Sequence, residues 1–153
     1  MARKFLAAWA GYLIATFIGG FVWHLLLFKE TYVDLKIFTR IDDPIIPLGL
    51  SAMFIQGALL AYIYPVLCRR RQPAVDGLRF GILAGVFLAT SAVLGEAGKN
   101  YVTSLSTWLL LETTYYLLQF TFSGLVIALA YGRQEEPVEH RMAGSAPSRP
   151  NQR

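Results

Sequence analysis

The stretch FLAAWAGYLIATFIGGFVWHLLLF, residues 5–28, carries no formally charged side chain over its whole length. An α-helix rises about 1.5 Å per residue, so roughly 20 apolar residues cross the hydrocarbon core of a bilayer. This stretch is therefore long enough to span a membrane. Arg3 and Lys4 precede it as they would in a signal peptide, but the apolar run is longer than a signal-peptide core and no small-residue cleavage site closes it. We expect a retained first helix.

Three further apolar stretches follow the first. They cover about residues 45–67, 77–96 and 107–132, and the last of them carries one carboxylate, Glu112. Charged residue types make up only 16% of the chain, so too little polar sequence remains to cover such runs with a soluble shell. The sequence predicts an all-α fold, an antiparallel bundle of four transmembrane helices, in a single domain at residues 1–133.

The polar segments outside these runs differ in character. Between Lys29 and Pro44, apolar side chains alternate loosely with charges, which predicts a short helix lying in the membrane interface. Residues 134–153 are rich in Pro, Ser, Gly and Arg and lack apolar periodicity, so we expect a disordered cytoplasmic tail.

Basic residues are denser on one side of the predicted bundle. That side holds Arg3 and Lys4, Arg69–Arg71, Arg79 and Arg133, whereas the lysines and arginines of the other side are mixed with carboxylates. The positive-inside rule then predicts that both termini are cytoplasmic. The same placement accounts for the net charge of +4, so the expected partner of the basic residues is the lipid bilayer and not nucleic acid.

An internal repeat is suggested by two segments that end the second and fourth helices. Residues 57–64, GALLAYIY, align with residues 124–131, GLVIALAY. One interpretation is a pair of similar helical hairpins in a parallel repeat. The alternative is chance similarity between two apolar helices.

Small residues recur every four positions along the predicted helices, and therefore lie on one face of each. Small side chains on such a face let two helix backbones approach closely. The alternative is that Gly and Ala are simply common in membrane helices. The positions expected in helix contacts are Gly11, Gly19, Gly81, Gly85 and Gly124.

Five polar side chains within or at the ends of the predicted spans are candidates for function. His24, Glu96 and Glu112 fall at a similar depth near the outer side, and Gln56 and Gln119 lie closer to the middle. Ionisable groups in a membrane segment are costly and usually face a bundle interior or a water-filled cavity.

The functional hypothesis is an outward-facing polar pocket that binds a small ligand or handles a proton. The structural alternative is that His24 and Glu112 bond each other or reach the headgroups, and that the two glutamines form interhelical hydrogen bonds.

Other kinds of site have little support, and we expect neither a metal nor a cofactor. One histidine with one or two carboxylates is an incomplete zinc ligand set, no Ser or Cys stands in a nucleophile motif, and no Gly-rich phosphate loop is present. Cys68 is the single cysteine, which excludes a disulfide framework. The neighbouring Arg69–Arg71 are expected to lower its pKa.

The segment from Trp23 to Lys29, WHLLLFK, followed by Tyr32, resembles segments of small four-helix bacterial inner-membrane proteins of unknown function. The Gln56-Gly57 pair adds to this resemblance, which covers Phe5 to Gly132. It implies a location in the bacterial inner (cytoplasmic) membrane and implies no active-site residue.

Three functional hypotheses follow from the sequence. The leading one is a non-enzymatic membrane protein that binds a small ligand or a partner helix through the outward-facing pocket. The second is a small transporter, proton-coupled through Glu112 and oligomeric, because four helices leave little room for an enclosed pathway. A membrane-embedded enzyme comes third. Besides the bilayer, the candidate partners are a second copy of the chain and another membrane protein.

Overall fold

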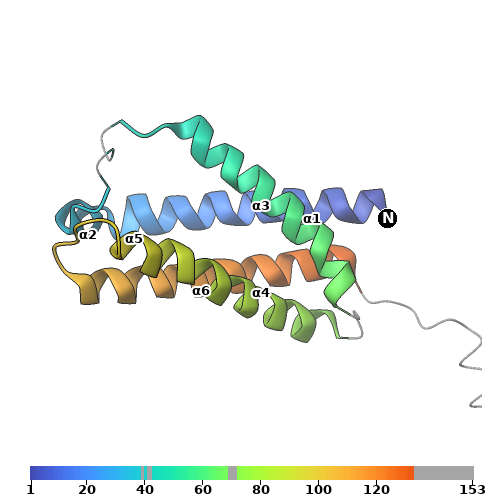
Figure 1. The fold of residues 1–153 in the computed structure, drawn as a ribbon. Helices are drawn as coiled ribbons and strands as arrows, with labels where there is room; N and C mark the ends of the chain where they lie inside the picture. The colour runs from blue at the N-terminus through green and yellow to red at the C-terminus, as the bar shows by residue number, and fades with distance from the viewer. Residues whose placement is uncertain (39, 41–42, 69–71, 133–153) are drawn as a thin grey trace, which may run out of the picture.

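The computed structural model describes residues 1–38, 40, 43–68 and 72–132, and these residues form an all-helical fold (Figure 1). Four of its helical segments are long and apolar enough to cross a membrane, as the sequence predicted: Ala2–Leu27, Ile46–Leu67, Pro73–Ala97 and Leu105–Tyr131. Together they indicate an integral membrane protein. The predicted tail at residues 134–153 and the arginines 69–71 and 133 lie outside the described residues.

Two of the four spans change their hydrogen-bonding pattern near one end. The first consists of α1, Ala2–Gly20, followed by the π-helix η1, Phe21–Leu27. The third consists of α4, Pro73–Ala89, the π-helix η2, Thr90–Leu94, and the short α5, Gly95–Ala97. π-Helices are rare in proteins. Those that occur, mostly as single turns within α-helices, are often found at functional sites. Nothing in the apolar pattern predicted them.

The other two spans are continuous α-helices, α3, Ile46–Leu67, and α6, Leu105–Tyr131. A prolyl residue stands in the first turn of α3 and of α4, where its missing N–H costs no helical hydrogen bond. This explains why α4 begins at Pro73, four positions before the predicted start at 77. The short α2, Lys29–Leu35, occupies the segment where a short helix was predicted, and the next residue, Lys36, lies in the left-handed region with φ 57°.

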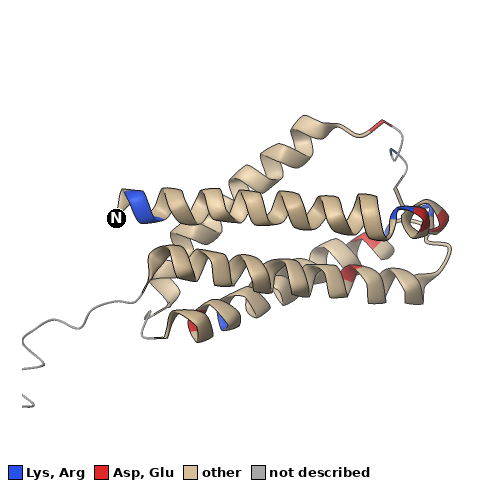
Figure 2. Cartoon of the chain, turned by 180° about the vertical axis from the view of Figure 1, so that it is seen from behind, with Lys and Arg blue, Asp and Glu red and all other residues tan. Residues whose placement is uncertain are grey.

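The helix α6 lies at the centre of the packing. Its most extensive contact is with α4, and its next is with α1. α3 begins away from the other helices and crosses α1 on its way to the start of α4 (Figure 1). Figure 2 shows that charged residues gather toward the two ends of the bundle. We call these the α2 end, which also holds α5, and the N-terminal end.

Each end has its own cluster of buried side chains. Near the N-terminal end, Ala8 and Tyr12 of α1 pack with Tyr64 of α3 and Ile127 of α6, all fully buried. At the α2 end, Leu35 of α2 packs with Trp108 of α6. Between the ends, the outward surface is apolar, as lipid contact requires.

The contact between α4 and α6 depends on glycine. A methyl group at Gly124 would lie 2.5 Å from the carbonyl oxygen of Gly77, and one at Gly81 would lie 2.7 Å from Cα of Thr121. At Gly85 the methyl would lie 3.0 Å from the carbonyl oxygen of Tyr116. The two backbones therefore touch along several turns. In lipid the hydrophobic effect does not drive helices together, so this van der Waals contact stabilises the pair instead.

The contact between α1 and α6 is less close at the backbone level. A methyl at Gly11 would lie 2.6 Å from the Val126 side chain, and one at Gly19 would lie 2.6 Å from Oε1 of Gln119. Here glycine makes room for a side chain of the partner helix.

Candidate functional site

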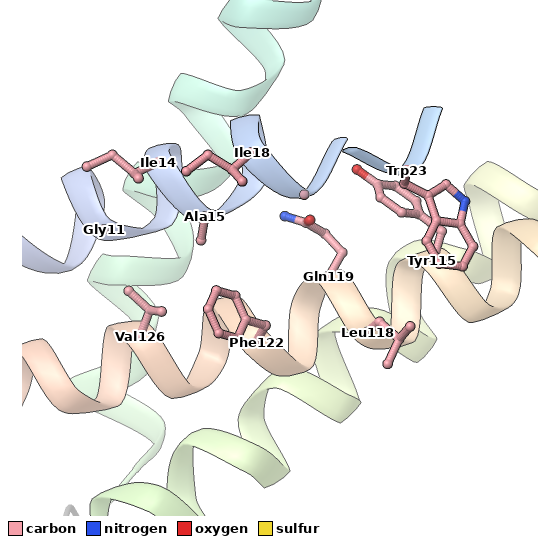
Figure 3. Close-up of a pocket in the computed structure, with 11 residues that line it drawn as sticks. Gly11, Ile14, Ala15, Ile18, Trp23, Tyr115, Leu118, Gln119, Phe122 and Val126 are labelled. Carbon is pink, nitrogen blue, oxygen red and sulfur yellow. The ribbon is translucent and has the colours of Figure 1, made fainter. Parts of the chain in front are cut away.

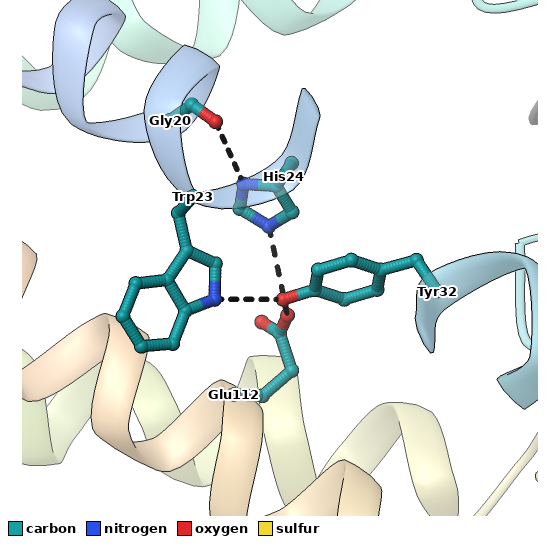
Figure 4. A network of polar contacts seen from close by, with 5 residues as sticks. All are labelled: Gly20, Trp23, His24, Tyr32 and Glu112. Carbon is teal, nitrogen blue, oxygen red and sulfur yellow. Dashed lines mark hydrogen bonds and ion pairs between the residues drawn. The ribbon is translucent and has the colours of Figure 1, made fainter. Parts of the chain in front are cut away.

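Three elements bring polar side chains together at the α2 end (Figure 4). η1 supplies Trp23 and His24, α2 supplies Tyr32, and α6 supplies Glu112. We call these four residues the His24–Glu112 cluster. The Tyr32 hydroxyl donates a hydrogen bond to Oε1 of Glu112, and Nε2 of His24 lies 3.6 Å from the same oxygen. The Trp23 indole N–H donates to the Tyr32 hydroxyl at 3.1 Å.

The cluster is closed off from its surroundings by its own members. Glu112 is 4% exposed and Tyr32 is 3% exposed, whereas His24 is partly exposed. The His24 ring stacks on Tyr32 at a centroid distance of 4.8 Å and meets Tyr115 edge-on at 4.5 Å. Because Glu112 and Tyr32 are buried, electrostatic interactions between them are stronger than at a wet surface.

The tautomer of His24 follows from its second contact. Nδ1 lies 3.1 Å from the carbonyl oxygen of Gly20, which can only accept a hydrogen bond. Nδ1 therefore carries the proton in the neutral ring, and Nε2 turns a lone pair toward Glu112. A lone pair facing a carboxylate is repulsive, and a proton on Nε2 or on the carboxyl group would make this contact attractive.

Tyr32 is fixed in its donor role. Burial, together with the hydrogen bond to Glu112 and its charge, raises the pKa of Tyr32 above its ordinary value. The hydroxyl therefore stays protonated across the physiological range and keeps donating to the carboxylate.

The position of α2, and hence of Tyr32, is held by contacts with the neighbouring spans. The backbone N–H of Thr103 donates to the carbonyl oxygen of Leu35 at 3.1 Å, which ties the end of α2 to the segment before α6. The indole of Trp108 donates to the carbonyl oxygen of Val93 in η2 at 3.0 Å, which ties α6 to the third span. The α2 end is therefore a connected unit.

Of the three ionisable candidates named from the sequence, the structure brings His24 and Glu112 together. Glu96 is exposed, and its carboxylate accepts a hydrogen bond from the Asn100 side chain at 2.7 Å. Among the described residues it takes no part in the polar contacts of the cluster. Its position at the end of the third span gives it a partner on the following turn instead.

The two glutamines lie further along the spans and bond across helices. Oε1 of Gln56 on α3 accepts a hydrogen bond from the Tyr12 hydroxyl on α1 at 3.2 Å. Nε2 of Gln119 on α6 donates to Oγ1 of Thr16 on α1 at 2.6 Å, and lies 3.4 Å from Oγ of Ser123. Both contacts link α1 to another span.

A groove of about 540 Å³ runs between α1 and α6 (Figure 3). Its walls are mostly apolar, with Gln119 in the middle and Trp23 and Tyr115 toward the α2 end. Neither His24 nor Glu112 lines it. The groove and the His24–Glu112 cluster are therefore neighbours, with Trp23 common to both.

Tyr32 and Trp23 were not among the site residues proposed from the sequence. Tyr32 lies in a connecting segment, and only the fold of α2 carries it back over the end of α6. The one available signal was a tyrosine at about the same membrane depth as an intramembrane carboxylate. A shared depth does not establish a contact.

The described residues contain no group of three or more His, Cys, Asp and Glu side chains suited to a metal ion. Comparison of the chain with protein-family models, with curated proteins and with solved structures finds no match.

Proposed function

We propose that this chain is a non-enzymatic integral membrane protein that binds a proton at the His24–Glu112 pair and, coupled to it, a small ligand or a partner helix at the α2 end. One observation carries the proposal. A carboxylate inside a candidate membrane span accepts a tyrosine hydroxyl while a histidine nitrogen lies 3.6 Å from the same oxygen. Buried charge in a membrane is expensive unless it is neutralised, and here the neutralising group is itself able to gain or lose a proton.

Coupling to a ligand or partner is supported by where the pair lies. His24 is partly exposed, and η1 and α2 separate Glu112 from the surroundings. A change of protonation alters what His24 can offer to a neighbouring group, from a hydrogen-bond acceptor at Nε2 to a donor.

Nuclear magnetic resonance of protein labelled with ¹⁵N-histidine tests the proton site. His140→Gln leaves His24 as the single histidine. We expect a fixed Nδ1–H tautomer in the neutral ring and a titration that Glu112→Gln alters. A freely averaging imidazole, unchanged by Glu112→Gln, would contradict the proposal.

A second candidate is a small oligomeric transporter, proton-coupled through Glu112. It is favoured by the polar side chains that α6 carries from the cluster toward its middle, namely Glu112, Tyr115, Gln119 and Ser123. The last two are buried, and Gln119 bonds to Thr16 of α1. Reconstituted liposomes with a pH-sensitive dye distinguish the candidates, because only transport gives a proton flux that Glu112→Gln abolishes. A membrane-embedded enzyme remains the third candidate, with no contact that favours it.

We further propose that the four spans run antiparallel, with the α2 end outside and both termini in the cytoplasm of a bacterial cell. The order of contacts between α4 and α6 supports this, because Gly77 faces Ala128 whereas Gly85 faces Leu117. Two similar hairpins, and kinship with small four-helix inner-membrane proteins, belong to the same proposal and rest on the sequence alone.

A further inference from the structure

A second pocket lies at the opposite end of the bundle, where α3 ends and α4 begins. Its volume is about 590 Å³. Apolar side chains from both helices form part of its wall, and polar side chains of the connection and of α4 form the rest. The apolar group is Leu67, Val75, Phe80 and Leu83, and the polar group is Gln72, Asp76 and Arg79.

Asp76 and Arg79 bring two opposite charges to this pocket. Oδ2 of Asp76 is buried and has no hydrogen-bond partner among the described residues. The ion pairs of the described residues lie elsewhere, between His24 and Glu112 and between Arg40 and Asp43. Asp76 stands in the first turn of α4, where the helix dipole favours a negative charge, but this leaves Oδ2 without a donor. Within the described part of the chain, Asp76 and Arg79 therefore share one pocket without pairing with each other.

The other ionisable group of the pocket, Cys68, is neutral. Burial raises the pKa of the Cys68 thiol, and the carboxylate of Asp76 raises it further. The described residues therefore raise this pKa, and Arg69–Arg71, which were expected to lower it, lie outside the described residues. The charges that the described residues offer to a ligand here are one carboxylate and one guanidinium.

The position of the pocket along the helices places it near a membrane surface. One candidate span ends at Leu67 and the next begins at Pro73, so these two helix ends lie at the level of lipid headgroups. Arg79 follows six residues into α4, about 9 Å along its axis. Leu83 lies one turn deeper and is 70% exposed, on the side that faces hydrocarbon. The polar part of the pocket thus opens onto an apolar strip.

We propose that this pocket binds the ammonium–phosphate headgroup of a zwitterionic phospholipid, of the phosphatidylethanolamine type. The ammonium group pairs with Asp76 and the phosphate with Arg79, while an acyl chain follows Leu67 and Leu83. Residues three apart on a helix are about 5–6 Å apart at Cβ, close enough for one headgroup to reach both. Rotation about χ2, which is soft in aspartate, turns either carboxylate oxygen toward the ligand.

Ligands with other headgroups pair with only one of the two charged side chains of the pocket. An anionic lipid such as phosphatidylglycerol pairs with Arg79 but leaves Asp76 without a donor and adds a like charge beside it. A free ammonium compound pairs with Asp76 alone. Free phosphoethanolamine carries the same ammonium and phosphate groups, but it is a phosphate monoester with more negative charge and lacks the chains that would contact the apolar strip.

Native mass spectrometry of the full-length protein in detergent tests the proposal, with phosphatidylethanolamine, phosphatidylglycerol and phosphoethanolamine as probes. The parent protein should retain phosphatidylethanolamine roughly tenfold better than phosphatidylglycerol, as one charge-assisted hydrogen bond allows. Asp76→Asn, which keeps the shape, should remove this preference. Arg79→Gln should weaken the binding of both lipids.

Asp34→Asn is the matched control, because Asp34 is an exposed aspartate on α2 at the other end of the bundle. It should keep the preference of the parent. Equal retention of the two lipids by the parent, or an unchanged preference in Asp76→Asn, would overturn the proposal. Phosphoethanolamine binding as tightly as the lipid would overturn the lipid as the source.

Discussion

The hydroxyl of Tyr32 and the carboxylate of Glu112 are joined by a hydrogen bond across 80 positions of the chain. Tyr32 belongs to the short α2, outside the four candidate spans, and Glu112 belongs to α6, two turns inside the last of them. This bond makes a connecting segment part of the intramembrane site.

Tyr32→Phe should destabilise the protein by roughly 1–3 kcal/mol, because it removes a donor from a buried carboxylate and keeps the ring. Thermal unfolding in detergent, followed by circular dichroism, measures the loss. Tyr101→Phe is the matched control, since Tyr101 lies near the same end and is 78% exposed. Equal stabilities of the two variants would mean that the Tyr32 hydroxyl contributes nothing to the fold.

Alkaline pH should destabilise the protein through Tyr32. Its pKa is raised in the folded state, so this contribution is fully present below the unfolded value of about 10 and is lost as the pH rises toward the folded pKa. The free energy of unfolding should therefore fall above pH 10, and more steeply for the parent than for Tyr32→Phe.

Tyrosinate absorbance gives an independent check of the raised pKa. Just above the ordinary tyrosine pKa of about 10, the folded parent and Tyr32→Phe should show the same absorbance change. After denaturation the parent should show one additional ionised tyrosine. A difference between the folded proteins would mean that Tyr32 ionises as an exposed phenol does.

Gly81→Ala should destabilise the bundle by roughly 1–3 kcal/mol, because the added methyl must enter a backbone contact with α6. Gly49→Ala is the control, since a methyl there has no neighbour within 4 Å. That variant should be neutral or slightly more stable, because alanine favours the helix. A Gly81→Ala protein with the melting temperature of the parent would show that the two helices separate easily.

Cysteine labelling in intact cells tests the proposed topology. In a background where Cys68 is replaced by Ala, Lys36→Cys should react with a membrane-impermeant maleimide added outside. Gln152→Cys should react only after the cells are opened. Reaction of both from outside would reverse the orientation of the C-terminal segment.

The four spans could be predicted from the sequence because each contains a long apolar run with few charges, and a single segment satisfies its own backbone in lipid only as a helix. The π-helices could not, since an extra residue per turn leaves the apolar composition unchanged. The start of α4 at Pro73 was missed for a related reason: Asp76 and Arg79 interrupt the apolar run, although the helix itself begins before them.

The candidate site was predictable in part. His24 and Glu112 were identified because an ionisable group in an apolar run is costly. Glu96 met the same criterion, but a residue at a helix end can also bond to a residue of the next turn. Glu96 does so by accepting a hydrogen bond from the Asn100 side chain. Tyr32 could be identified only once the fold of α2 was known, because its role arises from a contact between distant segments.

The glycine contact between α4 and α6 also limits how this protein can change shape. Backbones that touch at Gly77, Gly81 and Gly124 have no slack for sliding or rotation, so the third and fourth spans move as one rigid body. Conformational change then falls to α1, which meets α6 through side chains, and to α3, whose first turns lie away from the other helices (Figure 1). The His24–Glu112 pair joins the rigid body to the first span, so a change in protonation would act on the contact between these two parts.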